Sequence, residues 1–97
     1  MCGIFGYIGS QDAVKISIAG LKKLEYRGYD SSGIAGLRDG TVFRCREVGK
    51  VMAMEDKAKI EGLVLDTVIA HTRWATHGKP TLSNAHPHAD SKETMAL

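Results

Sequence analysis

The chain has 97 residues, of which 43% are hydrophobic and 25% charged, and its formal net charge is +2. This length allows one compact domain, and the composition is too hydrophobic for intrinsic disorder. The weak charge excludes a strong field for nucleic acid or anionic membranes, and no segment approaches the roughly 20 apolar residues that span a bilayer.

The first predicted element is a strand over residues 2–8, where Ile4, Gly6 and Ile8 alternate with Phe5 and Tyr7. A helix is expected next, over residues 11–24, with Ser10 as a possible cap. Apolar residues at helical spacing support it: Val14, Ile18 and Leu21. The polar, glycine-rich residues 26–33 predict a loop.

Asp39-Gly40 separates two short apolar runs, residues 34–37 and 41–45. Asp-Gly favours the tight turn whose twist matches paired strands, so the pattern predicts a β-hairpin. Residues 51–60 are mostly good helix formers, and Val51, Met54 and Ala58 share one face of the expected helix.

A β-branched run at residues 67–70 predicts a buried strand that leads into the polar residues 71–78. Residues 79–88 read as a long loop. Residues 93–97 look like the start of another strand, so we expect that the sequence is a truncated piece of a longer domain.

The two cysteines, Cys2 and Cys45, do not form the dense framework of a small secreted domain, and no signal-peptide pattern precedes them. These features predict a reduced, cytoplasmic setting. Because initiator methionine is typically removed before a small residue, Met1 followed by Cys2 predicts a mature chain that starts with cysteine. Cys45 alternates with Phe43 in a predicted strand and is expected to be a packing residue.

An N-terminal Cys2 would combine a thiol of pKa about 8.5 with an α-amine of pKa about 7.7–8.0 in one residue. The amine can take the thiol proton, directly or through water, and later deliver a proton to a leaving nitrogen. Acyl transfer is therefore the favoured chemistry. The alternative is that Cys2 is a small buried hydrophobe at a strand edge.

Arg73 carries a planar guanidinium that can hold a small carboxylate, and Thr76 and His77 add polar groups from the same segment. Trp74 could exclude water as part of a lid, although a lone tryptophan is more often a core anchor. Arg27 and Gly28 could form a second loop that faces this one, and a simple turn is the alternative.

Metal binding is the weakest reading of the polar residues. Its candidate ligands are Cys2, His71, His77, His86 and His88. The spacing contains no Cys-x-x-Cys or His-x-x-x-His pair, so no metal site is expected.

Taken together, residues 1–9, 24–33 and 70–78 resemble the class II glutamine amidotransferases, and Asn-Ala-His-Pro-His at 84–88 adds to the likeness. The resemblance implies an α+β fold of the N-terminal-nucleophile hydrolase type, a four-layer αββα sandwich that is incomplete in this chain. Residues 1–97 would then be the N-terminal portion of a glutaminase domain.

The resemblance also implies residue roles, with no cofactor and no metal. Cys2 would attack the side-chain amide of glutamine, form a glutamyl thioester and release ammonia, and water would then free glutamate. The expected glutamine-binding residues are Arg73, for the α-carboxylate, and Trp74, Thr76 and His77. Arg27 and Gly28 would shape the surroundings of the nucleophile.

The string His-Thr-Arg-Trp-Ala-Thr-His-Gly at 71–78 indicates the subgroup whose full-length, homo-oligomeric enzymes carry a C-terminal sugar-phosphate isomerase module. That module would use the ammonia to convert fructose 6-phosphate to glucosamine 6-phosphate. The family's oxyanion-hole Asn-Gly motif would lie beyond Leu97, so the 97 residues alone are expected to be nearly inactive. The alternative function is an inactive fragment or degenerate module that binds glutamine or a partner without turnover.

Overall fold

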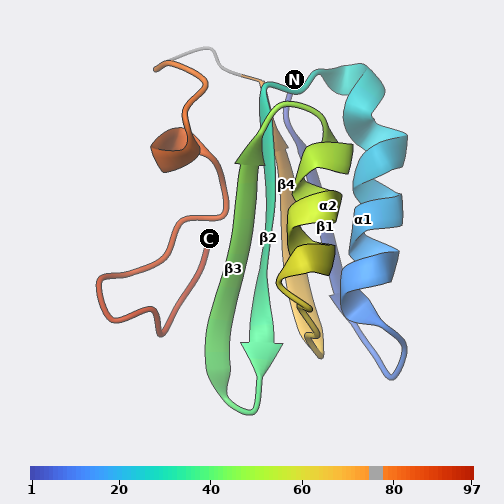
Figure 1. Cartoon of the computed structure of the whole chain (residues 1–97), viewed down its shortest axis with the longest axis vertical. Helices are drawn as coiled ribbons and strands as arrows, with labels where there is room; N and C mark the ends of the chain where they lie inside the picture. The colour runs from blue at the N-terminus through green and yellow to red at the C-terminus, as the bar shows by residue number, and fades with distance from the viewer. Residues whose placement is uncertain (75–77) are drawn as a thin grey trace.

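A four-stranded antiparallel sheet organises the computed structural model, which describes residues 1–74 and 78–97. The strand order is β1-β4-β2-β3. Two helices, α1 and α2, cover one face of this sheet (Figure 1). In chain order the elements are β1 (Gly3–Ile8), α1 (Ala13–Leu24), η1 (Glu25–Arg27), β2 (Ser31–Arg38), β3 (Thr41–Val48), α2 (Val51–Ile60), β4 (Thr67–Arg73) and η2 (Leu82–Asn84).

Helix α1 begins two residues into the segment predicted for it, at Ala13. Asp12 is its N-cap and accepts a hydrogen bond from the backbone N–H of Lys15 at 3.1 Å. The expectation that Ser10 caps this helix was therefore wrong, because the carboxylate of Asp12 binds one of the first free N–H groups of the helix. The three predicted core positions of α1 are all buried: Val14, Ile18 and Leu21.

The β2–β3 hairpin confirms the turn predicted at Asp39-Gly40. Both residues have positive φ angles, 51° and 77°, and the flanking Arg38 and Thr41 are paired. Positive φ at both central positions is the geometry that a two-residue hairpin loop requires, and Asp-Gly adopts it readily. Helix α2 also has the predicted bounds, and its expected core face is buried: Val51, Met54 and Ala58.

Strands β2 and β4 are longer than the sequence predicted. Ser31 and Ser32 belong to β2 rather than to the preceding loop, and His71 to Arg73 belong to β4. These strands lie at the centre of the sheet, where Ser32 pairs with both Glu47 and Thr72. Pairing on both sides satisfies the backbone, and this outweighs the low strand propensity of serine and glycine.

The two faces of the sheet differ in cover. The helix-covered face forms the core, in which the sheet contributes Ile34, Cys45, Val68 and Ala70. On the opposite face Ile4 and Ile8 are largely exposed, as the predicted alternation in β1 requires. This second face is only partly covered, by residues 78–97.

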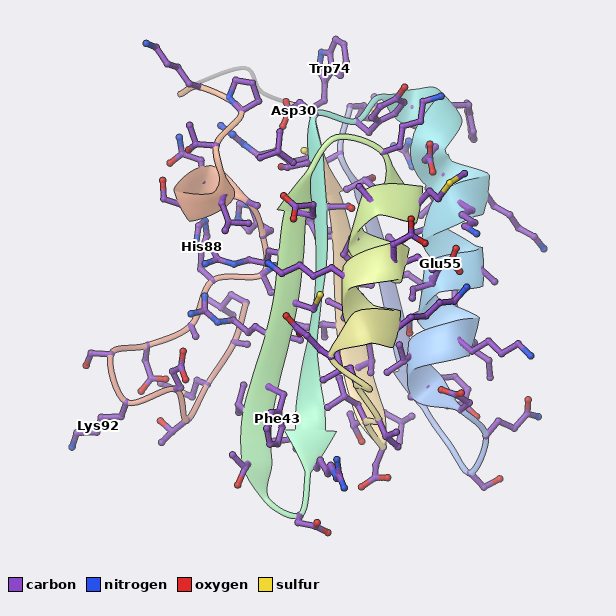
Figure 2. The ribbon with its side chains drawn as sticks, in the orientation of Figure 1. Asp30, Phe43, Glu55, Trp74, His88 and Lys92 are labelled. Atoms are coloured by element: carbon purple, nitrogen blue, oxygen red, sulfur yellow. The ribbon has the colours of Figure 1, made fainter. Side chains whose placement is uncertain are left out.

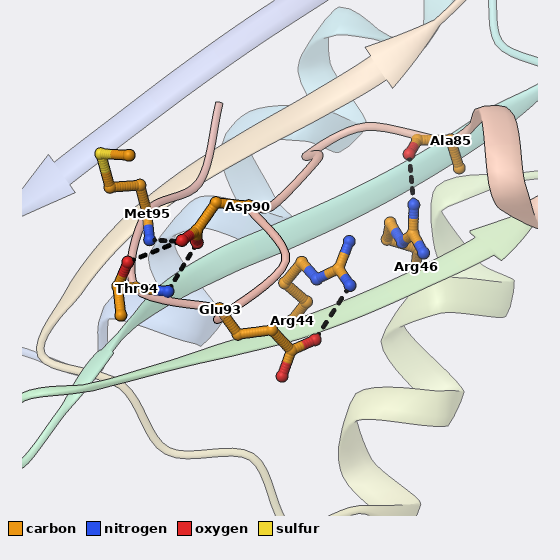
Figure 3. A network of polar contacts seen from close by, with 7 residues as sticks. All are labelled: Arg44, Arg46, Ala85, Asp90, Glu93, Thr94 and Met95. Atoms are coloured by element: carbon orange, nitrogen blue, oxygen red, sulfur yellow. Dashed lines mark hydrogen bonds and ion pairs between the residues drawn. The ribbon is translucent and has the colours of Figure 1, made fainter.

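The predicted strand at residues 93–97 was wrong. The segment instead folds back on itself, with only an isolated bridge between Ala89 and Ala96. The carboxylate of Asp90 accepts hydrogen bonds from the backbone N–H groups of Thr94 and Met95, at 2.6 and 2.9 Å (Figure 3). These bonds hold a turn, so the segment does not extend along the sheet. Arg44 anchors it to β3 through Glu93, at 3.1 Å.

No helix among the described residues is long and apolar enough to cross a membrane.

Candidate functional site

Cys2 lies at the start of the edge strand β1, beside the end of β4. Its Sγ accepts a hydrogen bond from the backbone N–H of Trp74 at 3.4 Å, and it lies 4.0 Å from the Trp74 carbonyl oxygen. The antiparallel pairing of Gly3 with Thr72 accounts for this proximity, because β1 begins where β4 ends (Figure 1). The side chain of Cys2 is exposed, so a ligand could reach the sulfur.

The N-terminus is held to two neighbouring segments. The ammonium group of Met1 donates to the carbonyl oxygen of Arg27 at 2.7 Å, and the guanidinium of Arg27 contacts the Met1 sulfur. One residue beyond Cys2, the N–H of Gly3 donates to the hydroxyl of Thr72 at 3.1 Å, in a buried position. The first three residues are therefore fixed in place, although chain ends usually fray.

Gly28 is the residue on which the indole of Trp74 rests. Its φ of 115° lies in a region that L side chains rarely adopt, and an added Cβ would lie 2.8 Å from the Trp74 ring. Only glycine permits both the conformation and this close approach. Gly28 is thus in contact with Trp74, and Trp74 stands half-exposed above the end of the sheet near Asp30 (Figure 2).

Arg73 is buried, with 8% of its surface exposed. Its guanidinium donates to the carbonyl oxygens of Lys79 and Gly78, at 3.1 and 3.4 Å. Its own carbonyl oxygen accepts the N–H of Asp30 at 2.7 Å. The side chain is therefore fixed one residue from Trp74, at the same end of the sheet as Cys2.

Two predicted glutamine-binding residues, Thr76 and His77, lie outside the described residues. Their roles stay predictions.

Sequence reasoning missed a row of imidazoles on the second face of the sheet. The rings of His71 and His86 have centroids 4.4 Å apart, and those of His86 and His88 are 4.3 Å apart. Burial, with the nearby charges of His86, His88 and Arg73, lowers the pKa of His71 to about 4. The His-Pro-His string was visible in the sequence, but its contact with His71 depends on how the chain folds back.

Within the described residues, no group of three or more histidine, cysteine, aspartate or glutamate side chains is arranged to hold a metal ion. Cys45 is a packing residue, as expected. It is 2% exposed, and burial raises the pKa of its thiol to about 11, which disfavours the reactive thiolate.

No family model matches the chain. Among curated proteins, it is 53% identical over all 97 residues to glutamine–fructose-6-phosphate aminotransferase (isomerizing) of Thermosynechococcus vestitus and 50% identical to that of Chlamydia abortus. The chain spans 16% of the length of each of these relatives.

Among solved structures, it resembles glutamine phosphoribosylpyrophosphate amidotransferase from B. subtilis, with a TM-score of 0.74 and 24% identity. The match covers 88% of this chain and 18% of that one. The chain therefore has part of the α+β fold of the N-terminal-nucleophile glutamine amidotransferases. At the level of sequence it corresponds to the N-terminal region of the glutamine–fructose-6-phosphate aminotransferases.

Proposed function

We propose that residues 1–97 are the N-terminal part of a glutaminase domain, in which Cys2 hydrolyses the side-chain amide of glutamine once Met1 is removed. The observation that carries this proposal is the contact between the exposed Cys2 sulfur and the backbone N–H of Trp74, directly after the buried Arg73. This contact brings the proposed nucleophile close to the segment that carries Arg73, the proposed carboxylate-binding residue. The relatives, which are aminotransferases named for glutamine, support the same reading.

The chemistry follows from a nucleophile and a base on one residue. The α-amine of Cys2 takes the thiol proton, the sulfur attacks the amide carbon, and the collapsing intermediate releases the nitrogen as ammonia with that proton. Water then adds to the thioester, again losing a proton to the amine, and the thiolate leaves as glutamate forms. The protonated amine returns the proton to the sulfur, which completes the cycle.

Arg73 binds the α-carboxylate of glutamine in this proposal. The carbonyl oxygens of Gly78 and Lys79 orient its guanidinium, and its burial strengthens a charge-assisted contact with a carboxylate. Trp74 lines the rest of the glutamine pocket. The resemblance adds Thr76 and His77 to this lining. Gly28 shapes the pocket by admitting the indole of Trp74, and Arg27 lies beside the terminus, where its carbonyl oxygen accepts a hydrogen bond from Met1 before that residue is removed.

For the whole protein we propose that the ammonia converts fructose 6-phosphate to glucosamine 6-phosphate in a C-terminal isomerase module, within a cytoplasmic homo-oligomer. The relatives are aminotransferases of the isomerizing kind, which supports both activities. Both cysteines are free thiols, which fits a reducing compartment.

The test compares two cysteine variants of the whole protein that contains this sequence. Cys2→Ala should lower ammonia release from glutamine by at least ~1,000-fold, because it removes the nucleophile. Cys45→Ala is the matched control and should retain activity, since Cys45 is buried on the helix side of the sheet. Intact mass spectrometry should show a chain that begins at Cys2. Undiminished ammonia release by Cys2→Ala would overturn the proposal.

If instead calorimetry shows that glutamine binds to the wild-type protein but no ammonia appears, the protein is a binding module without turnover.

A further inference from the structure

Thr72 is a fully buried residue whose hydroxyl supports the chain terminus. Its Oγ1 accepts the N–H of Gly3 at 3.1 Å. Gly3 belongs to β1, which is an edge strand of the described sheet and has a backbone partner on one side only. The hydroxyl therefore adds an anchor for β1 at the residue that follows Cys2.

The fit between these two residues is close. A Cβ on Gly3 would lie 2.8 Å from the Thr72 hydroxyl and 3.0 Å from the Cβ of Leu24. Because Gly3 has no side chain, its backbone packs directly against Thr72 and against Leu24 at the end of α1. A hydroxyl is required at position 72, because the buried N–H of Gly3 would lose its partner with an apolar side chain there.

Thr72 and Trp74 make hydrogen bonds on either side of the proposed nucleophile, one to the backbone that follows Cys2 and one to its side chain. Thr72 fixes the backbone just after Cys2, and two residues further along the chain, directly after β4 ends, the N–H of Trp74 contacts the sulfur. Neither contact alone determines where the sulfur and the α-amine of a processed Cys2 would lie. Together they fix the backbone and the side chain against the rigid end of β4.

We propose that Thr72 is a positioning residue for glutamine hydrolysis, acting through the N–H of Gly3 to hold the thiol and α-amine of Cys2 in register with Arg73 and Trp74. This inference rests on the proposed glutaminase function. Thr72 touches neither the sulfur nor the expected place of the substrate, so its loss should impair the chemical step rather than glutamine binding. A misplacement of about 1 Å at a reacting group can cost on the order of 100-fold in rate.

The experiment uses the whole protein with three substitutions at position 72 and one control. Thr72→Val keeps the shape and removes the acceptor, whereas Thr72→Ser keeps the hydroxyl. Ser32→Ala is the control, because Ser32 pairs with Thr72 across the sheet and is equally buried. The Ser32 hydroxyl has no hydrogen-bond partner among the described residues, so its removal tests only the local packing.

For Thr72→Val we expect kcat for ammonia release to fall about 10- to 100-fold while KM for glutamine changes by less than about threefold. Thr72→Ser should recover most of kcat, and Ser32→Ala should resemble the wild type. If Thr72→Val fails to fold, Thr72→Ala is compared with Thr72→Ser instead. Both variants lack the methyl group and differ only in the hydroxyl, so Thr72→Ala must have the lower kcat.

Wild-type kcat in Thr72→Val, or equal losses in Thr72→Val and Ser32→Ala, would overturn this inference and leave the glutaminase proposal standing. Failure of the glutaminase proposal has a different signature, namely a wild-type protein that releases no ammonia or a Cys2→Ala variant that still does.

Discussion

His71, His86 and His88 show how a fold can change the chemistry of single residues. Their rings line up between β4 and the segment that follows η2, and His88 projects from that segment (Figure 2). Burial is the largest cause of the lowered pKa values of His71 and His86. Neighbouring histidine charges and Arg73 lower both values further, and Arg46 adds to the effect at His86. The folded chain therefore favours the neutral imidazole at His71 and at His86.

Protonation of His71 should make stability depend on pH in a predictable direction. His71 has a pKa of about 4 in the folded chain and about 6.5 when unfolded, so the unfolded state binds the proton more readily between these values. The free energy of unfolding should be highest above about pH 6.5 and should fall as the pH drops from there toward 4. Urea unfolding midpoints should show this loss when they are measured from about pH 7.5 to about pH 5. This range includes the pKa of about 6.5 that histidine has in the unfolded chain.

His71→Gln, which cannot be protonated, should lose less stability across this range, whereas Lys92→Gln, an exposed change in the same C-terminal segment, should follow the wild type. Equal pH dependence in His71→Gln and the wild type would show that His71 is not the source of the effect.

At the scale of elements, the second face of the sheet is divided into a covered and an open part. Gly33 in β2 lies under the backbone of His86, and an added Cβ would collide with the His86 carbonyl oxygen and lie 2.8 Å from Cγ of Arg46. Gly6 in β1 points to the same face, but a Cβ there would meet only the Val68 carbonyl oxygen, at 3.9 Å. The backbone of the C-terminal segment covers Gly33, whereas no described segment packs closely over Gly6.

Gly33→Ala should therefore destabilise the fold by about 1–3 kcal/mol, because the backbone of the covering segment must move to admit one methyl group. Gly6→Ala is the matched control and should be neutral or slightly stabilising, since alanine restricts the unfolded chain more than glycine does. Urea unfolding of both variants measures the difference. A Gly33→Ala variant as stable as Gly6→Ala would show that residues 85–88 do not press on the sheet.

Local patterns in the sequence predicted the elements well where one signal decides the structure. Asp39-Gly40 specified the hairpin, and the apolar spacing in α1 and α2 identified their buried faces. The ends of β2 and β4 were not predictable in this way, because partners far along the chain supply their pairing. The turn at Asp90 has a similar cause, since one carboxylate captures N–H groups that a strand would have used.

The candidate site was only partly readable. Cys2, Arg73 and Trp74 could be singled out from their residue types and order, and the fold brings them to one end of the sheet. Thr72 gave no signal, because a threonine in a strand looks like ordinary β-propensity until its hydroxyl is seen against Gly3. Burial of Arg73 likewise depends on the carbonyl groups of the following loop.

At the scale of the whole molecule, the described chain leaves an apolar sheet face without full cover. Ile8 is 83% exposed and Ile4 75% exposed, and Ile69 lies beside them on β4. A cavity of about 360 Å³ continues this surface between the sheet and residues 94–97. The four-layer sandwich implied by the resemblance would bury the face beneath a second sheet, which residues 1–74 and 78–97 do not form.

The 97-residue chain by itself should therefore self-associate through this face, because exposed apolar surface beside an edge strand favours pairing with a second copy. Sedimentation velocity should show the average mass rising with concentration. Ile8→Lys should weaken the association, since it places a charge on the exposed edge strand. Met52→Lys is the control, because Met52 is an exposed apolar residue on α2, on the helix side of the sheet. A wild-type chain that stays monomeric, or equal effects of the two lysines, would show that this face does not drive association.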